Sequence, residues 1–165
     1  KVANHDSLTG LPNRHLLLDR LGQAIASSNR NKTHFALCFI DLDGFKPVND
    51  SYGHDAGDFV LKEVGIRLTA CVRENDTVAR LGGDEFVVIL VDIDASADLN
   101  ATLDRILASI KKPIAIPEGV DVAINLSMGV TIFPEDSGGP EELLNHADEA
   151  MYLAKKRGPG QYSIY

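Results

Sequence analysis

The most constraining feature of the sequence is residues 78–91, which predict two strands joined by a tight turn. Branched apolar residues dominate both flanks, and the turn is Gly82, Gly83, Asp84 and Glu85. Paired glycines permit the positive φ angles that a tight hairpin turn needs. Two carboxylates beside residues without a Cβ atom also leave space for a bulky polyanion, which a divalent cation could bridge to the acids. Taken alone, such a turn more often only reverses the chain.

Length and composition indicate one folded domain. The chain has 165 residues, enough for a continuous core of sheet and helix. Hydrophobic residues make up 44% and charged residues 24%, which is ordinary for a globular protein. No apolar run approaches the roughly 18 residues that a membrane-spanning helix needs. We therefore expect a soluble domain that makes no membrane contact itself.

The net charge limits the classes of ligand that the chain can bind, and the cysteine content indicates its compartment. With 24 acids against 16 bases, the net charge of −8 repels long nucleic acids and argues against binding of a nucleic acid polymer. A small phosphorylated ligand stays possible if a metal ion inverts the local field. Cys38 and Cys71 lie in apolar patterns and are expected to be packed thiols, not a disulfide or a zinc site. This usage fits a cytoplasmic location.

The hydrophobic pattern predicts an α/β (α+β) fold with a central, mixed, largely antiparallel sheet of five to six strands flanked by helices. Residues 44–53 are predicted to form a short irregular or helical connector, and the strand at 120–133 is expected to be cut short near Val130. Helices are predicted at residues 14–28, 55–73, 97–112 and 141–157. Besides the hairpin, strands are predicted at residues 35–40, 114–116, 120–133 and 162–165.

Two acids from distant parts of the chain are candidate metal ligands. Asp41 ends the continuous apolar run 35–40, and Asp84 lies in the hairpin turn. If the two strands are neighbours, both carboxylates meet at one edge of the sheet, beside the backbone carbonyl of Leu42. Hard oxygen ligands of this kind suit Mg²⁺, with substrate phosphates in the remaining positions. The alternative is that Asp41 is a solvated acid at a strand end.

A second group of polar residues lies between those acids. Lys46, Asn49, His54 and Asp58 lead into a predicted helix, and Gly57 leaves space around them. Guanine presents a donor edge and an acceptor edge, so a carboxylate and a carboxamide, here Asp58 and Asn49, are its natural complement. The alternative for Asp58 is that it stabilises the first turn of the helix.

Motifs in a characteristic order are spread over nearly the whole chain, at residues 6–14, 41–46, 49–54, 57–58, 80–86, 127–130 and 147–155. In sequence and spacing these segments resemble the GGDEF domains, the diguanylate cyclases of bacterial signalling. Ordered motifs of this extent are far more specific than one Gly-Gly-Asp turn. The resemblance implies a fold similar to the palm of class III nucleotide cyclases. It also implies condensation of two GTP molecules into cyclic di-GMP, with loss of pyrophosphate.

When the metal ligands of the family are placed on the matching positions of this sequence, the resemblance implies a metal site. Asp41, the Leu42 carbonyl and Asp84 would hold Mg²⁺ or Mn²⁺. Asp84, with Glu85 beside it, would help to deprotonate the 3′-hydroxyl that attacks the other GTP. Lys46 would face the phosphates.

The resemblance implies substrate-binding residues in the same way. Asn49 and Asp58 would read guanine, and His54 would line the nucleotide site. Lys155, Gly82 and Gly83 would also bind substrate. Because each domain holds one GTP and the nucleophile of each must reach the phosphate of the other, catalysis is expected in a two-fold homodimer.

Upstream of the hairpin, Arg73 and Asp76 resemble the family's inhibitory RxxD site for cyclic di-GMP. An Arg offers a bidentate fork to phosphate or a face to guanine, and an Asp can accept from a guanine edge. The alternative is a local surface ion pair without function, worth about 0–1 kcal/mol.

The family pattern breaks at Pro159, which stands where an Arg usually helps to hold the terminal phosphates. A proline removes a guanidinium and a backbone donor together. Lys156 or Arg157 could substitute, although basic residues at a helix end also have a dipole explanation.

Three functions remain open from the sequence. The first is an active diguanylate cyclase, which the intact acids favour. The second is a weakly active or inactive domain that binds GTP or cyclic di-GMP and controls a fused output domain such as a phosphodiesterase, which Pro159 favours. A class III cyclase that makes cyclic mononucleotides is disfavoured by the hairpin motif and Asp58. We expect residues 1–165 to be one domain of a longer multidomain protein with fused sensor or output domains.

Overall fold

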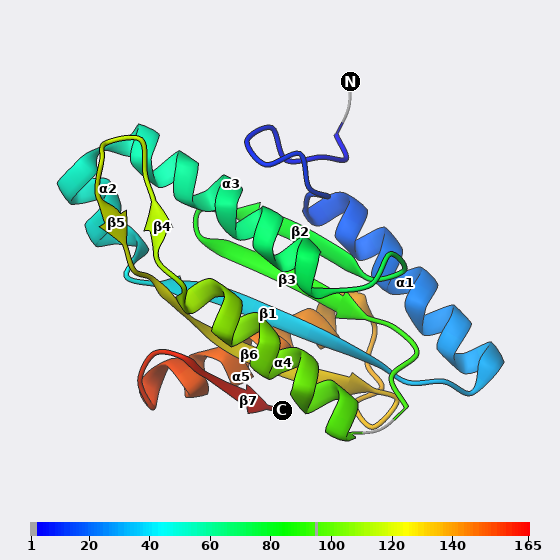
Figure 1. Cartoon of the computed structure of the whole chain (residues 1–165). Coiled ribbons are helices and arrows are strands. Elements are labelled where there is room, and N and C mark those ends of the chain that lie inside the picture. The colour runs from blue at the N-terminus through cyan, green and yellow to red at the C-terminus, as the bar shows by residue number, and fades with distance from the viewer. Residues whose placement is uncertain (1–2, 95) are drawn as a thin grey trace.

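A five-stranded sheet in the order β2-β3-β1-β6-β7 forms the centre of the computed structural model, which describes residues 3–94 and 96–165 (Figure 1). The strands are β1 (Phe35–Asp43), β2 (Thr77–Gly82), β3 (Glu85–Leu90), β6 (Asn125–Phe133) and β7 (Gln161–Ile164). The helices are α1 (Arg14–Asn31), α2 (Phe45–Tyr52), α3 (His54–Cys71), α4 (Ser96–Lys111) and α5 (Pro140–Lys156). The predicted mixed sheet with flanking helices is confirmed.

Strand β1 lies at the middle of the sheet, antiparallel to β3 on one side and to β6 on the other. Its residues 35–40 are all buried, as the continuous apolar run predicts. Strand β7 pairs in parallel with β6 at one edge, and β2 pairs with β3 at the other. At the end of β1, Asp41 is opposite both Glu85 and Ser127.

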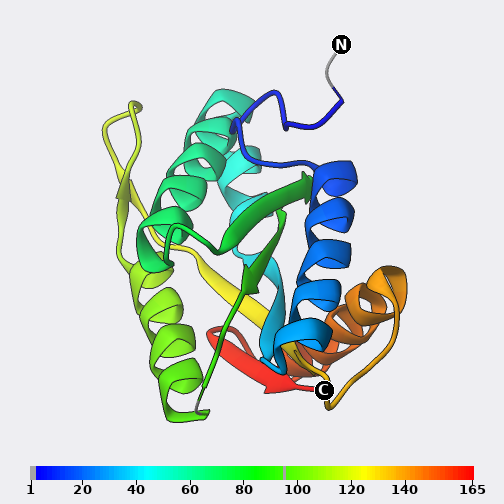
Figure 2. The ribbon, with the colours of Figure 1, turned by 90° about the vertical axis from the view of Figure 1, so that its right-hand side faces the viewer.

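Helices cover both faces of the sheet (Figure 2). One apolar cluster joins α2, α3 and α4 to the side chains that alternate along β1 from Ala36 to Leu42. A second cluster joins α1 and α5 to the opposite set, from Phe35 to Phe39. The two clusters account for the apolar stripes of the helices, and both cysteines are buried free thiols. No helix in the described part of the chain is long and apolar enough to cross a membrane.

Helix α5 packs directly on the backbone of β6. A Cβ atom on Gly129 would lie 2.0 Å from the carbonyl oxygen of Ala147 and 2.1 Å from the amide nitrogen of Met151. This close approach is possible only because Gly129 has no side chain. It fixes the height of α5 over the sheet, and with it the position of the residues near the end of the helix.

The sequence prediction was wrong about the long strand 120–133. It does not break near Val130, which pairs with Cys38 inside β6 and is buried. The break lies earlier, at residues 123–124, after a two-stranded hairpin of β4 (Ile114–Ala115) and β5 (Asp121–Val122). Pairing with β1 runs along the whole of β6, from Asn125 opposite Asp43 to Phe133 opposite Phe35, so the strand continues through Val130. The connector 44–53 contains helix α2 (Phe45–Tyr52), which is the helical one of the two forms predicted for it.

Candidate active site

The register of the sheet brings the two predicted metal ligands together. Asp41 pairs with Glu85, the first residue of β3, and the N–H of Leu42 donates to the carbonyl of Asp84 at 3.2 Å. Residues far apart in the sequence therefore meet at the end of β1. The turn between β2 and β3 is built by Gly82 and Gly83, with φ angles of 137° and 50°. The first of these angles is open only to glycine without strain, which explains the residue type.

Acidic side chains crowd this edge. Burial, followed by the charge of Asp41 and a hydrogen bond with it, raises the pKa of Asp84 to about 6. Burial and the charge of Asp41 also raise the pKa of Glu85. Asp148, on α5, has its pKa raised by burial and again by Asp41. Four acids thus repel one another across three elements, and a cation among them would relieve that repulsion.

The ammonium group of Lys155 lies beside two acids at the end of β1. Its Nζ lies 2.6 Å from Oδ2 of Asp41 and 3.9 Å from Oδ1 of Asp43. The hydrogen bond to Asp41 raises the pKa of Lys155, so the lysine stays charged. Asp43 in turn accepts a 2.8 Å hydrogen bond from the hydroxyl of Ser127. The end of α5 therefore supplies positive charge to the acids at the end of β1.

These residues fit a hard divalent cation. Among the described residues, no group of three or more His, Cys, Asp or Glu side chains could hold a metal ion without other ligands. Two carboxylates, Asp41 and Asp84, leave most coordination positions open. That is the usual arrangement for Mg²⁺, which keeps water and substrate phosphates as ligands. Asp84, whose pKa is raised by burial and then by the charge of Asp41, is the side chain that such an ion would help to ionise.

The predicted guanine-binding residues lie on α2 and α3. The side chain of Asn49 lies against the backbone of Gly57, where a Cβ atom would be 1.7 Å from Oδ1 of Asn49 and 3.3 Å from Cζ of Phe45. Gly57 therefore gives Asn49 its place between the two helices. Asp58 follows directly and is exposed.

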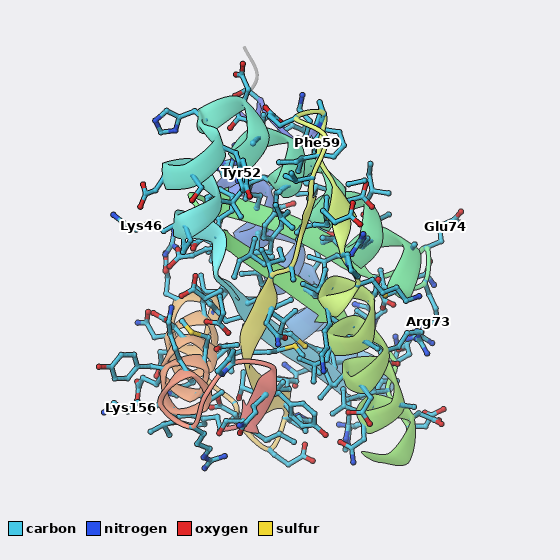
Figure 3. The ribbon with its side chains drawn as sticks, turned by 60° about the vertical axis from the view of Figure 1, so that its left-hand side comes forward. Lys46, Tyr52, Phe59, Arg73, Glu74 and Lys156 are labelled. Carbon is cyan, nitrogen blue, oxygen red and sulfur yellow. The ribbon has the colours of Figure 1, made fainter. Side chains whose placement is uncertain are left out.

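Three predicted residues are not brought to the acids by any contact. Lys46, His54 and Asp58 are exposed, and within the described residues no hydrogen bond or ion pair joins them to Asp41 or Asp84. Lys46 projects from α2 on the same side as Lys156 of α5 (Figure 3). Lys46, His54 and Asp58 are therefore free to contact a ligand that lies over the end of β1.

A polar network holds the hairpin turn from behind. Arg80 donates to the carbonyl of Gly83 through Nε at 3.1 Å and Nη2 at 2.8 Å, and through Nη1 to Asp6 at 2.9 Å. Asp6 also accepts from the N–H and hydroxyl of Thr9. Burial alone would raise the pKa of Asp6, but the hydrogen bonds from Thr9 and Arg80 outweigh burial and lower that pKa. The segment before α1 therefore positions the turn that carries Asp84.

Arg73 and Asp76 line a separate cavity of about 240 Å³. Arg73 is 61% exposed, whereas the carboxylate of Asp76 is 2% exposed. Asp76 accepts from the N–H of Arg73 at 2.8 Å and from the N–H of Val91 at 3.0 Å. Arg105 of α4 lines the same cavity and donates to the carbonyl of Cys71. Figure 3 places Arg73 on the side of the molecule opposite Lys46 and Lys156.

Comparison with known proteins decides the family. The family model described as "Diguanylate cyclase, GGDEF domain" matches residues 3–161. The chain belongs to the GGDEF domain family. Its match covers the acids, the hairpin and the cavity at Arg73 together, so the resemblance in the motifs extends to the whole fold.

Relatives of this GGDEF domain include larger signalling proteins. It is 44% identical over 158 residues to the diguanylate cyclase TpbB of Pseudomonas aeruginosa, covering 96% of this chain and 36% of TpbB. It is 46% identical over 165 residues to the bifunctional diguanylate cyclase/cyclic di-GMP phosphodiesterase MucR of the same species, covering 100% of this chain and 24% of MucR. The chain thus spans about a third or less of the curated relatives it matches.

Solved GGDEF structures share the fold. The GGDEF domain of TpbB has a TM-score of 0.91 at 42% identity, covering 94% of this chain and 97% of that chain. The GGDEF domain of DgcB from Caulobacter crescentus, solved in complex with c-di-GMP, has a TM-score of 0.90 at 28% identity, covering 99% and 96%. The palm-like sheet expected from the motifs is therefore confirmed.

Sequence reasoning missed five residues of this GGDEF domain that support the sites. Asp148 and Ser127 lay within motifs that carried the family resemblance, but nothing in their spacing showed that they face β1. Asp6 and Arg80 were likewise part of motifs, and only the fold reveals their ion pair. Arg105 is an ordinary residue of an amphipathic helix, and no sequence signal pointed to the cavity that it lines.

Proposed function

We propose that this GGDEF domain condenses two molecules of GTP into cyclic di-GMP and releases pyrophosphate. The observation that supports this most is the meeting of Asp41 and Asp84 at the end of β1, where the pKa of Asp84 is raised to about 6. Such a pair of carboxylates is suited to binding a metal ion and a polyphosphate, and it contributes little to the packing of the core. Asp41, the Leu42 carbonyl and Asp84 would hold Mg²⁺ or Mn²⁺.

Each remaining residue has a role that follows from its charge and place. Bound there, the metal ion would lower the pKa of the 3′-hydroxyl and neutralise charge that develops on the phosphoryl group. Lys155, beside Asp41, would move its ammonium group to the phosphates, and Lys46 would contact them from α2. Asp84, with Glu85 beside it, would help to remove the proton of the attacking hydroxyl. Gly82 and Gly83 would let the substrate approach the backbone closely.

Base recognition would fall to Asn49 and Asp58, with His54 beside the nucleotide. Asn49 can accept from and donate to guanine, and Asp58 accepts only. Since one domain holds one nucleotide, two domains related by a two-fold axis would bring each 3′-hydroxyl to the α-phosphate of the other GTP. Activity would therefore depend on dimerisation, and domains fused in a longer protein would control it.

The decisive experiment is incubation of the domain with GTP and Mg²⁺, with a leucine zipper fused to force dimerisation and nucleotide chromatography as the readout. We expect cyclic di-GMP and pyrophosphate in a ratio of one to two. The same protein with EDTA is the control. GTP that remains intact in the zipper dimer, although it binds, would contradict the proposal.

One observation favours a second function, binding of GTP or cyclic di-GMP without turnover. Pro159 replaces the expected Arg and lines a cavity with Asp104 and Lys111 of α4, and the lining of that cavity does not include Asp41 or Asp84. The triphosphate then depends on Lys155 and Lys46 for cationic contacts. In the zipper dimer, this function predicts GTP binding by calorimetry with no product. Pro159→Arg would then raise GTP affinity.

Gly57 provides a test of base recognition. We expect Gly57→Ala to raise the KM for GTP about tenfold, because the new methyl group would overlap Oδ1 of Asn49 and displace its carboxamide. A lost hydrogen bond of this kind is worth roughly 1.4 kcal/mol, which is tenfold. The measurement is initial rate against GTP concentration in the zipper dimer.

The control for this variant is Gly22→Ala in α1, where nothing lies within 4 Å of the added Cβ. Gly22→Ala should leave the KM unchanged. If Gly57→Ala lowers the rate at saturating GTP but not the KM, Asn49 does not read the base.

We also propose that the cavity at Arg73 binds cyclic di-GMP and restrains the enzyme. Arg73 is mostly exposed, and Arg105 adds a second guanidinium to the same cavity. Two such groups suit a ligand with two phosphates and two guanines. Asp76, which accepts two backbone N–H groups, would shape the turn that presents Arg73.

Arg73→Ala is therefore expected to raise the concentration of cyclic di-GMP needed for half inhibition at least tenfold, without lowering the initial rate. Loss of one charged hydrogen-bond donor to phosphate costs roughly 1.5–3 kcal/mol. The measurement is the rate of pyrophosphate release with added cyclic di-GMP. Arg30→Ala, at an exposed position late in α1, is the control. An unchanged inhibition curve would leave Arg73 as a surface ion pair.

A further inference from the structure

The outer face of α5 carries an exposed apolar pair. Tyr152 is 57% exposed and Leu153 is 52% exposed, although both are large and the buried face of the helix is fully packed. A hollow of about 440 Å³ lies at these two residues and is also lined by Asp148 and Glu149. Neighbouring exposed apolar side chains rimmed by charge are typical of a surface that binds a partner.

The charges along this face have a symmetric order. Two acids, Asp148 and Glu149, precede the apolar pair, and two bases, Lys156 and Arg157, follow it. All four are exposed. Counted from the midpoint between Tyr152 and Leu153, Glu149 and Lys156 lie at equal separations along the helix, and so do Asp148 and Arg157.

This order is complementary to itself. If two copies of α5 pack antiparallel about a two-fold axis at that midpoint, each acid lies opposite a base of the other copy. The Tyr152 ring of one copy then lies against Leu153 of the other. A two-fold interface requires such self-complementarity, since one patch must fit the same patch. Charge therefore favours a second copy of this chain as the partner over an unrelated protein.

The face adjoins the active site. Lys155, on the same helix, is bonded to Asp41, and Asp148 lies close enough for the charge of Asp41 to act on it. Lys156, whose Nζ lies 4.7 Å over the Tyr152 ring, projects on the same side of the molecule as Lys46 (Figure 3). A second copy bound here would lie at the edge of the sheet where the acids meet. The site needs such a copy, because one domain holds one of the two nucleotides.

We infer that the outer face of α5, centred on Tyr152 and Leu153, packs against the same face of a second copy in the catalytic dimer. This inference rests on the proposed function for the need of two copies. The paired ions at its rim, Glu149 with Lys156 of the partner subunit, select the antiparallel orientation and exclude the parallel one, in which like charges would meet.

The first test is cross-linking of Leu153→Cys with a short bis-maleimide in the presence of GTP and Mg²⁺. The native thiols of Cys38 and Cys71 are buried, so the new thiol is the one that reacts. We expect a covalent dimer that forms cyclic di-GMP at protein concentrations where the unlinked domain is inactive. The control is Ile66→Cys on α3, which is 64% exposed on the other face of the sheet and should give no active dimer.

The second test reverses charges. Glu149→Lys and Lys156→Glu should each raise the protein concentration for half-maximal rate roughly tenfold, because like charges then meet across the axis. The double variant, with both charges exchanged, should return to the wild-type concentration. A purely structural effect within one domain would not be rescued in this way.

The outcomes separate this inference from the proposed function. If the zipper dimer of the wild-type domain makes cyclic di-GMP but the single charge reversals leave the concentration dependence unchanged, the inference is wrong and the function stands. An inactive covalent Leu153→Cys dimer alongside an active zipper dimer would also overturn it. If the zipper dimer makes no product, the function fails, and the yield of covalent dimer still reports the interface.

Discussion

Asp84→Asn is expected to reduce cyclic di-GMP formation by the zipper dimer about 10³-fold or more while the domain stays folded. A metal ion stabilises the transition state of phosphoryl transfer by several kcal/mol, and each 1.4 kcal/mol is tenfold in rate. Asparagine keeps the shape of the side chain and the backbone carbonyl that accepts from Leu42. It removes the charge that a divalent cation needs. The measurement is a rate at saturating GTP and Mg²⁺.

Asp84→Asn should lower the rate but should not lower the stability of the fold. The pKa of Asp84 is raised in the folded state to about 6, so the folded domain binds this proton more tightly than the unfolded chain. Ionised Asp84 therefore weakens the fold as pH rises from about 4 to about 6, and the full penalty is present above that range. Asn carries no such charge. At pH 7.5 without divalent cations, Asp84→Asn should melt no lower than wild type.

The matched control is Asp121→Asn, an exposed acid on β5 of the separate two-stranded sheet, which should change neither rate nor melting temperature. Two results would contradict the role of Asp84. One is an Asp84→Asn variant with more than a tenth of the wild-type rate. The other is a clear fall in melting temperature at pH 7.5, which would mean that the carboxylate supports the fold.

Much of the fold could be predicted because the signals are local. The run 35–40 is apolar at every position, and that pattern is typical of a strand buried on both faces. The glycines at 82–83 identify a turn whatever surrounds them. Helical stripes on α1, α3 and α5 are visible at a spacing of three to four residues. Helix ends are less well predicted: α1 begins at Arg14 as predicted but ends at Asn31 and not at residue 28, since its end depends on a cap, Lys32 in the left-handed conformation.

The site could be predicted only in outline because it is assembled by long-range pairing. Nothing in the sequence fixes Glu85 opposite Asp41, since the register of a sheet depends on the packing of whole strands. The contact of Lys155 with Asp41 depends on the height of α5 over β6. The ion pair of Arg80 with Asp6 joins the start of the chain to the hairpin. Family resemblance indicated the residues, and the fold determines the contacts among them.

Gly129→Ala should be the most destabilising single methyl addition to this domain. The new Cβ would lie about 2 Å from two backbone atoms of α5, the Ala147 carbonyl oxygen at 2.0 Å and the Met151 nitrogen at 2.1 Å. Backbone atoms inside a helix cannot move singly, so the whole of α5 must shift away from β6. Overpacking of this kind costs about 3 kcal/mol or more. For a domain of this size, that lowers the melting temperature by about 10 °C.

The control is again Gly22→Ala, which adds the same methyl group in a helix with nothing within 4 Å of it. Alanine is the better helix former by roughly 0.5–1 kcal/mol, so this variant should melt slightly higher than wild type. The measurement for both is thermal unfolding followed by circular dichroism. If Gly129→Ala melts within 2–3 °C of wild type, a change of about 1 kcal/mol, α5 is not held at the observed height.

The same substitution connects packing to chemistry. Lys155 lies one turn beyond Met151 on α5, and its ammonium group reaches Asp41 at 2.6 Å because the helix lies close to β6. A shift of even 1 Å would separate the lysine from Asp41, and a misplacement of that size far from the reacting atoms can cost about 10²-fold in rate. Gly129→Ala, assayed well below its melting temperature, should therefore lose activity while still folded. Retained activity in a folded but destabilised variant would show that Lys155 reaches the phosphates without the support of β6.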